Sequence, residues 1–445
     1  MSLDEVIVKR NQGVNTTTEK VEYSETGVKV IRANNISTGI VDYSNCVYVA
    51  EKTFERIKDA CKPQKGDILY TNIGSQLGNA ALVNTDENFV IAWNVLRLQP
   101  SNKINADFLV YLLNNPSNKK MIQSLNSSST MPFVSGGEIG KVEFSFPDLN
   151  KQAEIAKILK SLDDKIHLNN QINQTLESIA QAIFKSWFID FEPVRAKIAA
   201  KQEGKDPERA AMCVISGKSE VELHQMAEDD FAELQATAAL FPDEFVESEL
   251  GEVPKEWEVK PLDKIANYLN GLALQKFRPE NEYDFLPIVK IAQLKSGVAT
   301  IEEKASPNID RKFIIENGDV IFSWSGSLMV DIWCGGKAAL NQHLFKVTSN
   351  DYHKWLYYFY TKHHLAEFQR IAQAKAVTMG HIKREHLSQA LCCIASNQLL
   401  EISNIFIGHF LQKLIELRLE NNNLKQLRDT LLPKLLSGEV EVENL

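Results

Sequence analysis

Cysteine is scarce in this chain, and the few cysteines are poorly placed for cross-linking or metal binding. The 445 residues include 6 cysteines, at positions 46, 61, 213, 334, 392 and 393. They form no Cys-x-x-Cys pair, and no histidine stands at a zinc-site spacing from any of them. We therefore expect neither a disulfide framework nor a metal site. Cys392 and Cys393 lie in an apolar run, where we expect both to pack as small core residues.

Long apolar runs are also missing. No stretch approaches the ~18 apolar residues of a membrane span, and residues 1–10 lack the apolar segment of a secretion signal. These absences predict a cytoplasmic protein with no membrane partner. The composition, 44% hydrophobic and 24% charged, is that of a globular chain, and the length suits two or three domains.

Excess positive charge is absent, since the formal net charge is -9. Residues 195–250 hold 13 acidic and 6 basic side chains, whereas residues 1–150 hold 16 and 15 and residues 251–396 hold 16 and 18. One connecting segment thus carries most of the acidity. Any affinity for a polyanion such as DNA must come from local clustering and from partner proteins.

Catalytic motifs are incomplete wherever they begin. The run Asn115-Pro116-Ser117 stops short of the Asn/Asp-Pro-Pro-aromatic element that amino-methyltransferases need, and no glycine-rich cofactor loop is found. Residues 216–219, Ser-Gly-Lys-Ser, copy the end of a phosphate loop, but Met212 stands where its first glycine belongs. The adjacent pair His363-His364 cannot face one way on a helix. These observations predict no catalytic residue and no cofactor bound by this chain.

An internal repeat organises the sequence, with an offset of 247 to 260 residues. The matching segments occur in one order in both halves. They are Leu3-Asp4 with Leu262-Asp263, Val28-Lys29-Val30 with Ile288-Val289-Lys290, Gly66-Asp67 with Gly318-Asp319, Gly74-Ser75 with Gly326-Ser327, Phe108-Leu109 with Trp355-Leu356, and Thr130-Met131 with Thr378-Met379. The chain therefore contains two similar domains.

Each repeat mixes strand and helix signals. The Gly-Asp pairs precede the apolar runs Ile68–Tyr70 and Val320–Phe322, a pattern typical of a turn that enters a strand. The aromatic-rich segments 106–114 and 354–361 have helical patterning and are expected to cover a sheet. Each repeat is thus predicted to be an α+β domain of roughly 150 residues.

A long helix is predicted after each repeat, with apolar residues in alternating steps of four and three. The first seam is Ile155, Leu159, Leu162, Ile166, Asn169, Asn173, Leu176, Ala180, Ile183 and Trp187. The second, shifted by 248, is Ser403, Ile407, Phe410, Leu414, Leu417, Asn421, Leu424, Arg428, Leu431 and Leu435. Asn173 and Asn421 stand at the same point of the two seams and are expected to fix the register of an antiparallel coiled coil. Helix pairing is assigned to these two and to Leu162, Ile166, Leu414 and Leu417; two ordinary core helices are the alternative.

Several ordered motifs resemble the specificity subunit of type I restriction-modification systems. Leu250–Trp257 (LGEVPKEW) is similar to the opening of that family's second target recognition domain. Phe184–Phe191 (FKSWFIDF) resembles the end of its first spacer helix, and Leu427–Gly438 (LRDTLLPKLLSG) its C-terminal signature. Thr378–Ile382 (TMGHI) is similar to a late-domain loop. One departure is that the first domain has no counterpart of Pro254-x-x-Trp257, an edge that C-terminal residues could supply.

The resemblance implies a non-catalytic α+β protein with two target recognition domains separated by two long antiparallel spacer helices. The segments are then residues 1–150 (first recognition domain), 151–194 (central spacer helix), 195–250 (acidic linker with a helix at 221–239), 251–396 (second recognition domain) and 397–445 (C-terminal spacer helix). The implied partners are double-stranded DNA, two methyltransferase subunits and two restriction subunits. S-adenosylmethionine, ATP and magnesium would be used by those partners.

Base reading requires donor and acceptor side chains on loops, and such residues follow the Gly-Asp strands. The DNA-binding candidates are Asn72, Ser75, Gln76, Asn79, Ser323, Ser325, Ser327, Lys337, Asn341, Gln342, His343, Thr378, His381 and Lys383. For each one, an ordinary loop or strand position is the alternative. Two other functions stay open at this stage: a coiled-coil scaffold with duplicated protein-binding domains, and a single-chain restriction or modification enzyme.

Overall fold

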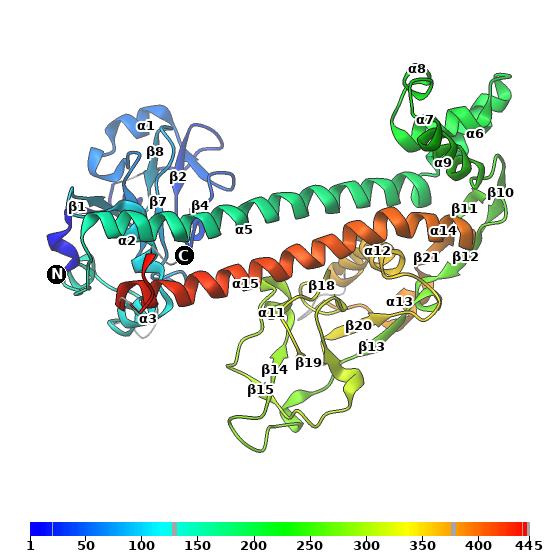
Figure 1. The fold of residues 1–445 in the computed structure, drawn as a ribbon. Coiled ribbons are helices and arrows are strands. Elements are labelled where there is room, and N and C mark those ends of the chain that lie inside the picture. The colour runs from blue at the N-terminus through cyan, green and yellow to red at the C-terminus, as the bar shows by residue number, and fades with distance from the viewer. Residues whose placement is uncertain (20, 127–130, 375–379, 438, 443–445) are drawn as a thin grey trace. The chain divides into compact units, whose positions relative to one another are not determined.

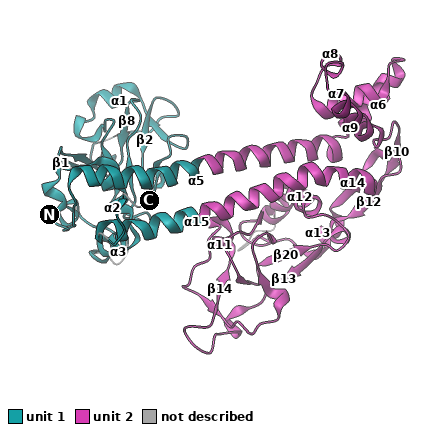
Figure 2. Ribbon diagram, viewed as in Figure 1, with its two compact units in different colours: residues 1–167, 423–445 teal, residues 168–422 magenta. Residues whose placement is uncertain are grey.

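The computed structural model describes the whole chain except residues 20, 127–130, 375–379, 438 and 443–445 (Figure 1). Contacts divide it into two compact units (Figure 2). Unit 1 comprises Met1–His167 and Asn423–Leu445, and unit 2 comprises Leu168–Asn422. Each unit contains one copy of the repeat and a part of each long helix. The five-segment division stays a prediction.

The main sheet of unit 1 is antiparallel, with strand order β1-β9-β6-β7. A second sheet has the order β5-β2-β8, and its strands β2 and β8 run parallel. The strands are β1 (Ile7–Gln12), β2 (Val28–Ile31), β3 (Ile36–Ser37), β4 (Ile40–Val41), β5 (Val47–Val49), β6 (Ile68–Thr71), β7 (Ala80–Leu82), β8 (Phe89–Ile91) and β9 (Val95–Pro100). The shorter helices are α1 (Glu51–Arg56), α2 (Ala106–Asn114), α3 (Pro116–Ser124) and α4 (Gly136–Gly140).

Unit 2 repeats this topology, which confirms the duplication. Its antiparallel sheet has the order β13-β20-β17-β18, and β14 runs parallel to β19 as β2 does to β8. The strands are β13 (Asn267–Asn270), β14 (Leu286–Val289), β15 (Lys304–Ala305), β16 (Ile314–Ile315), β17 (Val320–Ser323), β18 (Met329–Ile332), β19 (Ala338–Leu340) and β20 (Leu344–Thr348). The helices are α10 (Leu262–Ile265), α11 (Ile291–Ser296), α12 (Lys354–Ala374) and α13 (Arg384–Gln389).

The predicted helices over 106–114 and 354–361 are confirmed as α2 and the start of α12. Helix α2 begins because Asn105 Oδ1 accepts a hydrogen bond of 2.9 Å from the Phe108 amide, a side-chain cap. Its apolar residues are buried toward the sheet, and α12 packs in the same way on β17, β18 and β20. Cys392 and Cys393 are buried in β21 (Leu391–Ile394), which pairs with β12 (Glu258–Pro261), and so pack as small core residues.

Each predicted Gly-Asp turn leads into a strand and also anchors an ion pair, which is buried in unit 1 and half-buried in unit 2. Gly66 and Gly318 have φ of 93° and 90°, which residues with a side chain rarely adopt. The next residue caps the turn: Asp67 accepts from the Gln64 amide at 2.7 Å, and Asp319 from the Glu316 amide at 2.8 Å. Asp67 then pairs with Arg97 at 2.7 Å, and Asp319 with Lys346 at 2.7 Å.

Two long helices are shared between the units. They are α5 (Leu149–Phe184), which continues into the π-helical segment Lys185–Ile189, and α15 (His409–Ser437), which follows α14 (Asn397–Ser403) and the π-helical segment Asn404–Gly408. Within unit 1, Asp163 pairs with Arg428 at 2.7 Å. Within unit 2, Asn169 bonds to Asn421 at 2.9 Å. Residue numbers rise along one helix as they fall along the other, so the helices are antiparallel, and the predicted α+β class with two long helices is confirmed.

The residues assigned to helix pairing are all buried or half-buried. Ile166, Asn173, Leu414, Leu417 and Asn421 are buried, and Leu162 is half-buried. In unit 1, seam residues of both helices join the core of the first recognition domain; they include Ile155, Leu159, Leu431 and Leu435. The long helices therefore contribute side chains to the core of the domain in addition to pairing with each other.

The pairing of the seam asparagines differs from the expectation. Asn421 bonds to Asn169 and Asn170, both at 2.9 Å, while Oδ1 of Asn173 has no partner among the described residues. Asn169 and Asn421 are the equivalent pair, because they are 252 residues apart, the offset of the Gly-Asp turns. The shift of 248 used to align the seams singled out Asn173 instead.

The acidic segment 195–250 contains more helix than expected. It includes α6 (Glu192–Gln202), α7 (Pro207–Ser216), α8 (Glu220–Leu223) and α9 (Glu228–Ala239), followed by the hairpin β10 (Phe245–Ser248) and β11 (Gly251–Pro254). Residues from α7, α8 and α9 form a small core of their own, which includes Met212 and Leu223. The sequence Gly204-Lys205-Asp206-Pro207 was interpreted as a linker, but Asp206 caps α7 and Pro207 is its first residue, a helix-start signal.

The pairing at the start of the first domain differs from that of the second. Leu3 and Phe144 make backbone hydrogen bonds of 3.0 Å to Val142 and Met1, in place of the β12–β21 pair of unit 2. Val440 and Val442 pack against the same core, together with the end of α15. C-terminal residues therefore complete this part of the first domain.

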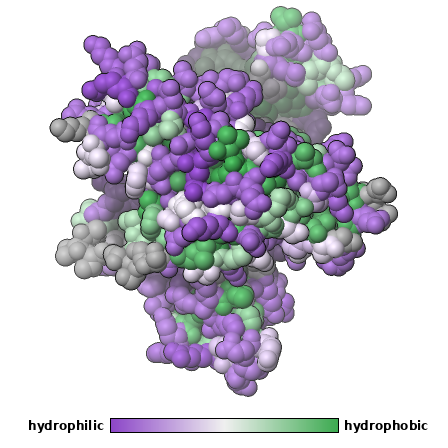
Figure 3. Space-filling model, turned by 90° about the vertical axis from the view of Figure 1, so that its left-hand side faces the viewer, coloured by the Kyte–Doolittle hydropathy of each residue, from purple (hydrophilic) through white to green (hydrophobic). Residues whose placement is uncertain are grey.

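Figure 3 shows one face of the molecule, on which hydrophilic side chains (purple) surround limited apolar areas (green). Among the described residues, no helix combines the length and apolar character needed to span a bilayer.

Candidate nucleic-acid interface

In unit 1, the predicted residues lie in the β6–β7 hairpin, where two of them hold the loop in place. The side chains of Asn72 and Gln12 exchange hydrogen bonds of 3.1 and 3.3 Å, and Asn72 also donates to the Val134 carbonyl at 3.2 Å. Asn79 donates to the Ile36 carbonyl and to Gln76 Oε1, both at 2.9 Å. Both asparagines are buried, so their amides fix the hairpin rather than face solvent.

The same hairpin exposes Ser75 and Gln76. Beside it, the ammonium group of Lys119 donates to Asn79, and burial lowers the pKa of this lysine. A buried amide frame thus presents two exposed polar side chains, the arrangement that a recognition loop needs. Ser75 and Gln76 are the residues of this hairpin that can reach a ligand.

In unit 2, the structure brings four predicted residues into one cluster. Ser325 Oγ lies 3.1 Å from His343 Nδ1, and His343 Nε2 lies 3.3 Å from Gln342 Nε2. Ser325 also forms a β-bridge with His381. Ser325 is buried, Gln342 and His343 are half-buried, and His381 is exposed. The cluster therefore offers an amide and two imidazoles at one edge of the sheet.

The other candidates of unit 2 are spread more widely. Ser323 and Asn341 are buried, whereas Ser327, Lys337 and Lys383 are exposed. Lys337 precedes β19, whereas Gln342 follows it, so the two lie beyond opposite ends of that strand. Thr378 lies outside the described residues. The base-reading roles of all these residues stay predictions.

Trp324, the aromatic residue at the centre of the unit 2 cluster, was not among the residues predicted from the sequence. The indole N–H of Trp324 donates to Asn270 Oδ1 at 3.0 Å, and the indole ring lies within about 6 Å of the His343 and His381 rings. The Asn270–Trp324 contact in unit 2 corresponds to Gln12–Asn72 in unit 1, because each joins the first strand to the end of the Gly-Asp strand. The signal available was the position of Trp324 between two candidate serines.

Two basic residues were also missed. Arg32 and Lys290 directly follow the equivalent strands β2 and β14, and their amides donate to Asn35 Oδ1 at 3.1 Å and Gln293 Oε1 at 3.2 Å. The same backbone motif therefore places a cation at the same point of each domain. A repeated cation suits a phosphate contact, for which Lys290 would have to exchange its present ion pair with Glu303. Nothing in the local sequence marks these residues, because their equivalence depends on the strand pairing.

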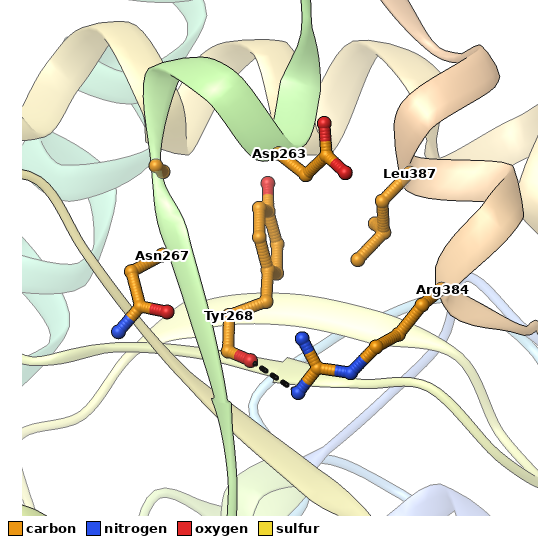
Figure 4. A pocket seen from close by; sticks show the side chains of 6 residues that line it. Asp263, Asn267, Tyr268, Arg384 and Leu387 are labelled. Carbon is orange, nitrogen blue, oxygen red and sulfur yellow. Dashed lines mark hydrogen bonds between the residues drawn. The ribbon is translucent and has the colours of Figure 1, made fainter.

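A small polar cavity of about 140 Å³ lies in unit 2 between α10, β13 and α13 (Figure 4). It is lined by Asp263, Ala266, Asn267, Tyr268, Arg384 and Leu387. Arg384 Nη2 donates to the Tyr268 carbonyl at 3.1 Å, and Asp263 Oδ2 accepts from Ser388 at 2.6 Å. Burial raises the pKa of Tyr268. These bonds tie α13 to β13 and to α10, and α13 directly follows the segment that carries His381 and Lys383.

The described residues contain no group of three or more His, Cys, Asp or Glu side chains placed to hold a metal ion. The clusters at the sheet edges consist of amides, hydroxyls, imidazoles and cations. Such groups can donate to and accept from base edges and phosphates. The geometry therefore defines a binding protein with two similar polar edges.

Comparison with known proteins agrees with this class. The family described as the type I restriction modification DNA specificity domain matches residues 1–178 and 254–428. The specificity subunit of the type I restriction enzyme HindI of Haemophilus influenzae is 31% identical over 400 residues, covering 85% of this chain and 87% of the relative. The MjaIX specificity subunit of Methanocaldococcus jannaschii is 26% identical over 398 residues, covering 86% and 79%.

Among solved structures, the S subunit of a type I restriction-modification system from M. genitalium aligns with 98% of this chain and 95% of its own, with a TM-score of 0.47 and 14% identity. The chain belongs to the family of type I restriction-modification DNA specificity domains and carries two copies of that domain. The resemblance seen in the sequence motifs is confirmed.

Proposed function

We propose that this chain is the non-catalytic specificity subunit of a type I restriction-modification complex, in which each recognition domain reads one half of a bipartite DNA target. The observation that carries the proposal is the repeated sheet edge, which has the same backbone frame in both units but different polar side chains. One frame with two sets of side chains suits two different half-sites. For a pseudo-symmetric reader, such half-sites lie on one face of the duplex, about 34 Å apart.

The two long helices set the distance between the half-sites and dock two methyltransferase subunits, to which two restriction subunits are added. Catalysis, with S-adenosylmethionine, ATP and magnesium, belongs to these partners. The methyltransferase extrudes the target base while this chain holds the flanking duplex. Because both domains are nearly neutral, much of the electrostatic grip on DNA comes from the partners.

The test is to co-express the chain with its cognate methyltransferase and to map methylated positions by sequencing. The expected result is a single bipartite target with a fixed gap. A continuous target, or no methylation in a complex that assembles, would overturn the proposal. Binding of a random duplex as tightly as the mapped target would favour a scaffold, and methylation by this chain alone would show that it is an enzyme.

A further inference from the structure

The turn that follows the parallel strand pair is held by the same backbone bonds in both units. The Val95 amide donates to the Ala92 carbonyl at 2.9 Å, and the Leu344 amide donates to the Asn341 carbonyl at 3.0 Å. Gly13 then donates to the Val95 carbonyl, and Gly271 to the Leu344 carbonyl, both at 3.0 Å. The turns 92–95 and 341–344 are therefore structural equivalents.

The glycines allow this close approach. A Cβ atom at Gly13 would overlap the carbonyl oxygen of Ala92, and a Cβ atom at Gly271 would overlap that of Asn341. Neither position can carry a side chain unless the turn moves. The residues that follow the glycines form equivalent parallel β-bridges, Val14 with Ala92 and Leu272 with Asn341. These bridges fix the alignment of the two turns. Trp93 thus occupies the position of Gln342, and Asn94 that of His343.

The side chains on this rigid frame differ between the units. Trp93 is 49% exposed, although its backbone carbonyl accepts a hydrogen bond from Gln12. Four of the other five tryptophans are buried, and Trp324 bonds to Asn270. Beside Trp93, Asn94 Oδ1 accepts from the Ala33 amide at 3.2 Å, so this side chain is used to hold the turn. Trp93 is therefore the outward-facing side chain of the first turn.

An exposed indole on a fixed backbone is suited to contact a ligand. Burial of its apolar surface is favourable, and the rigid turn loses little conformational freedom on binding. In a DNA groove, apolar side chains distinguish bases through contact with the methyl group of thymine, whereas amides read adenine through two hydrogen bonds. The same position thus offers apolar contact in one unit and an amide in the other.

We infer that the turns 92–95 and 341–344 are specificity-determining elements, and that Trp93 makes an apolar contact with a thymine methyl group in the first half-site. Gln342 presents its amide at the corresponding point of the second half-site. This inference rests on the proposed function. It assigns Trp93 a role in specificity that its exposure in the unbound chain otherwise leaves unexplained.

The test uses the complete complex of this chain with its methyltransferase. Trp93→Gln should change the base preferred at one position of one half-site, lowering discrimination there at least about fivefold, and should leave the other half unchanged. Trp93→Phe keeps an aromatic ring and should retain the preference. Tyr23→Gln is the matched control, because Tyr23 is 50% exposed in the same unit but lies outside the turn.

An unchanged target for Trp93→Gln would overturn the inference, as would an equal loss at every position of both half-sites. The reciprocal variant Gln342→Trp, expected to alter only the other half-site, keeps the inference testable if Trp93→Gln fails to assemble. A wild-type complex with no bipartite target would instead refute the proposed function, so the two failures are distinguishable.

Discussion

The side-chain amide of Asn169 donates a hydrogen bond of 2.9 Å to Oδ1 of Asn421, its equivalent in the other half of the sequence. Both residues are buried between the two long helices. A buried amide is stable only with its partner in place, so this pair favours one register over others that would bury more leucine. The bond is thus a device for register.

Replacing only Asn421 by leucine should lower the free energy of unfolding by about 1–3 kcal/mol, because the Asn169 amide then keeps only Glu420 as an acceptor and Asn170 Oδ1 loses its donor. The double variant Asn169→Leu/Asn421→Leu should recover most of this loss. Thermal unfolding of the two single variants and the double variant measures the coupling. Additive effects would show that the pair does not act as a unit.

The length of the paired helices should determine the gap between the half-sites. Adding one heptad to each helix, after Leu168 and after Asn422, keeps the seams in phase and lengthens each by about 10 Å. The mapped target should then gain about three base pairs in its gap, with both half-sites unchanged. A heptad in one helix alone breaks the pairing and should impair assembly. An unchanged gap in the double insertion would contradict the spacer role.

The ion pair at each Gly-Asp turn should contribute more to the free energy of unfolding the more deeply it is buried. Asp67 and Arg97 have side chains only 5% and 10% exposed, whereas Asp319 and Lys346 are 23% and 18% exposed. Asp67→Ala leaves a buried guanidinium without its carboxylate and should cost about 3–5 kcal/mol of stability. Asp319→Ala should cost less. Calorimetry on both variants decides the point, and equal losses would show that burial is not the controlling factor.

Gln342→Ala should relax recognition at one base of one half-site, at a cost of about 1–3 kcal/mol in discrimination. The physical reason is the loss of an amide that can donate to and accept from the same base. Gln225→Ala is the control, because Gln225 is exposed in the same unit but lies between α8 and α9. Binding assays with each base substituted in turn would reveal the pattern. A uniform loss for all sequences would indicate a phosphate contact instead.

Acid should destabilise unit 2 through His364. Burial lowers the pKa of His364 to about 4, and neighbouring His363 acts in the same direction. The unfolded chain, with the ordinary value of 6.5, therefore binds a proton first as the pH falls. The stability that depends on neutral His364 is complete above pH 6.5 and is lost as the pH falls toward about 4.

His364→Gln should flatten this decline, because glutamine can still donate to the Leu391 carbonyl, which lies 3.0 Å from His364 Nε2. Urea unfolding of the wild type and the variant at pH 7 and at pH 5 measures the difference. Parallel losses in the two proteins would assign the acid sensitivity to other groups.

The sequence by itself determined the architecture of this protein. The ordered repeat predicted two similar domains, because the same turn, strand and helix signals occur in both copies. These signals are local preferences of the chain. The alternating steps of four and three between apolar residues predicted two long helices, because this periodicity places the apolar residues on one buried face. The exposed candidates Ser75 and Gln76 also follow directly from their place in a hairpin after a Gly-Asp strand.

Only the tertiary structure decided which residues meet. Asn421 bonds to Asn169, 252 residues away in the sequence, and the seam pattern alone did not show that an offset of 252 rather than 248 relates the two helices. Trp93 and Gln342 are equivalent through strand pairing, although their side chains share no chemistry. The amides of Asn72 and Asn79 are buried because they bond to residues that are distant in sequence, Val134 and Ile36. Contacts between residues distant in sequence depend on register and burial, which a local pattern does not specify.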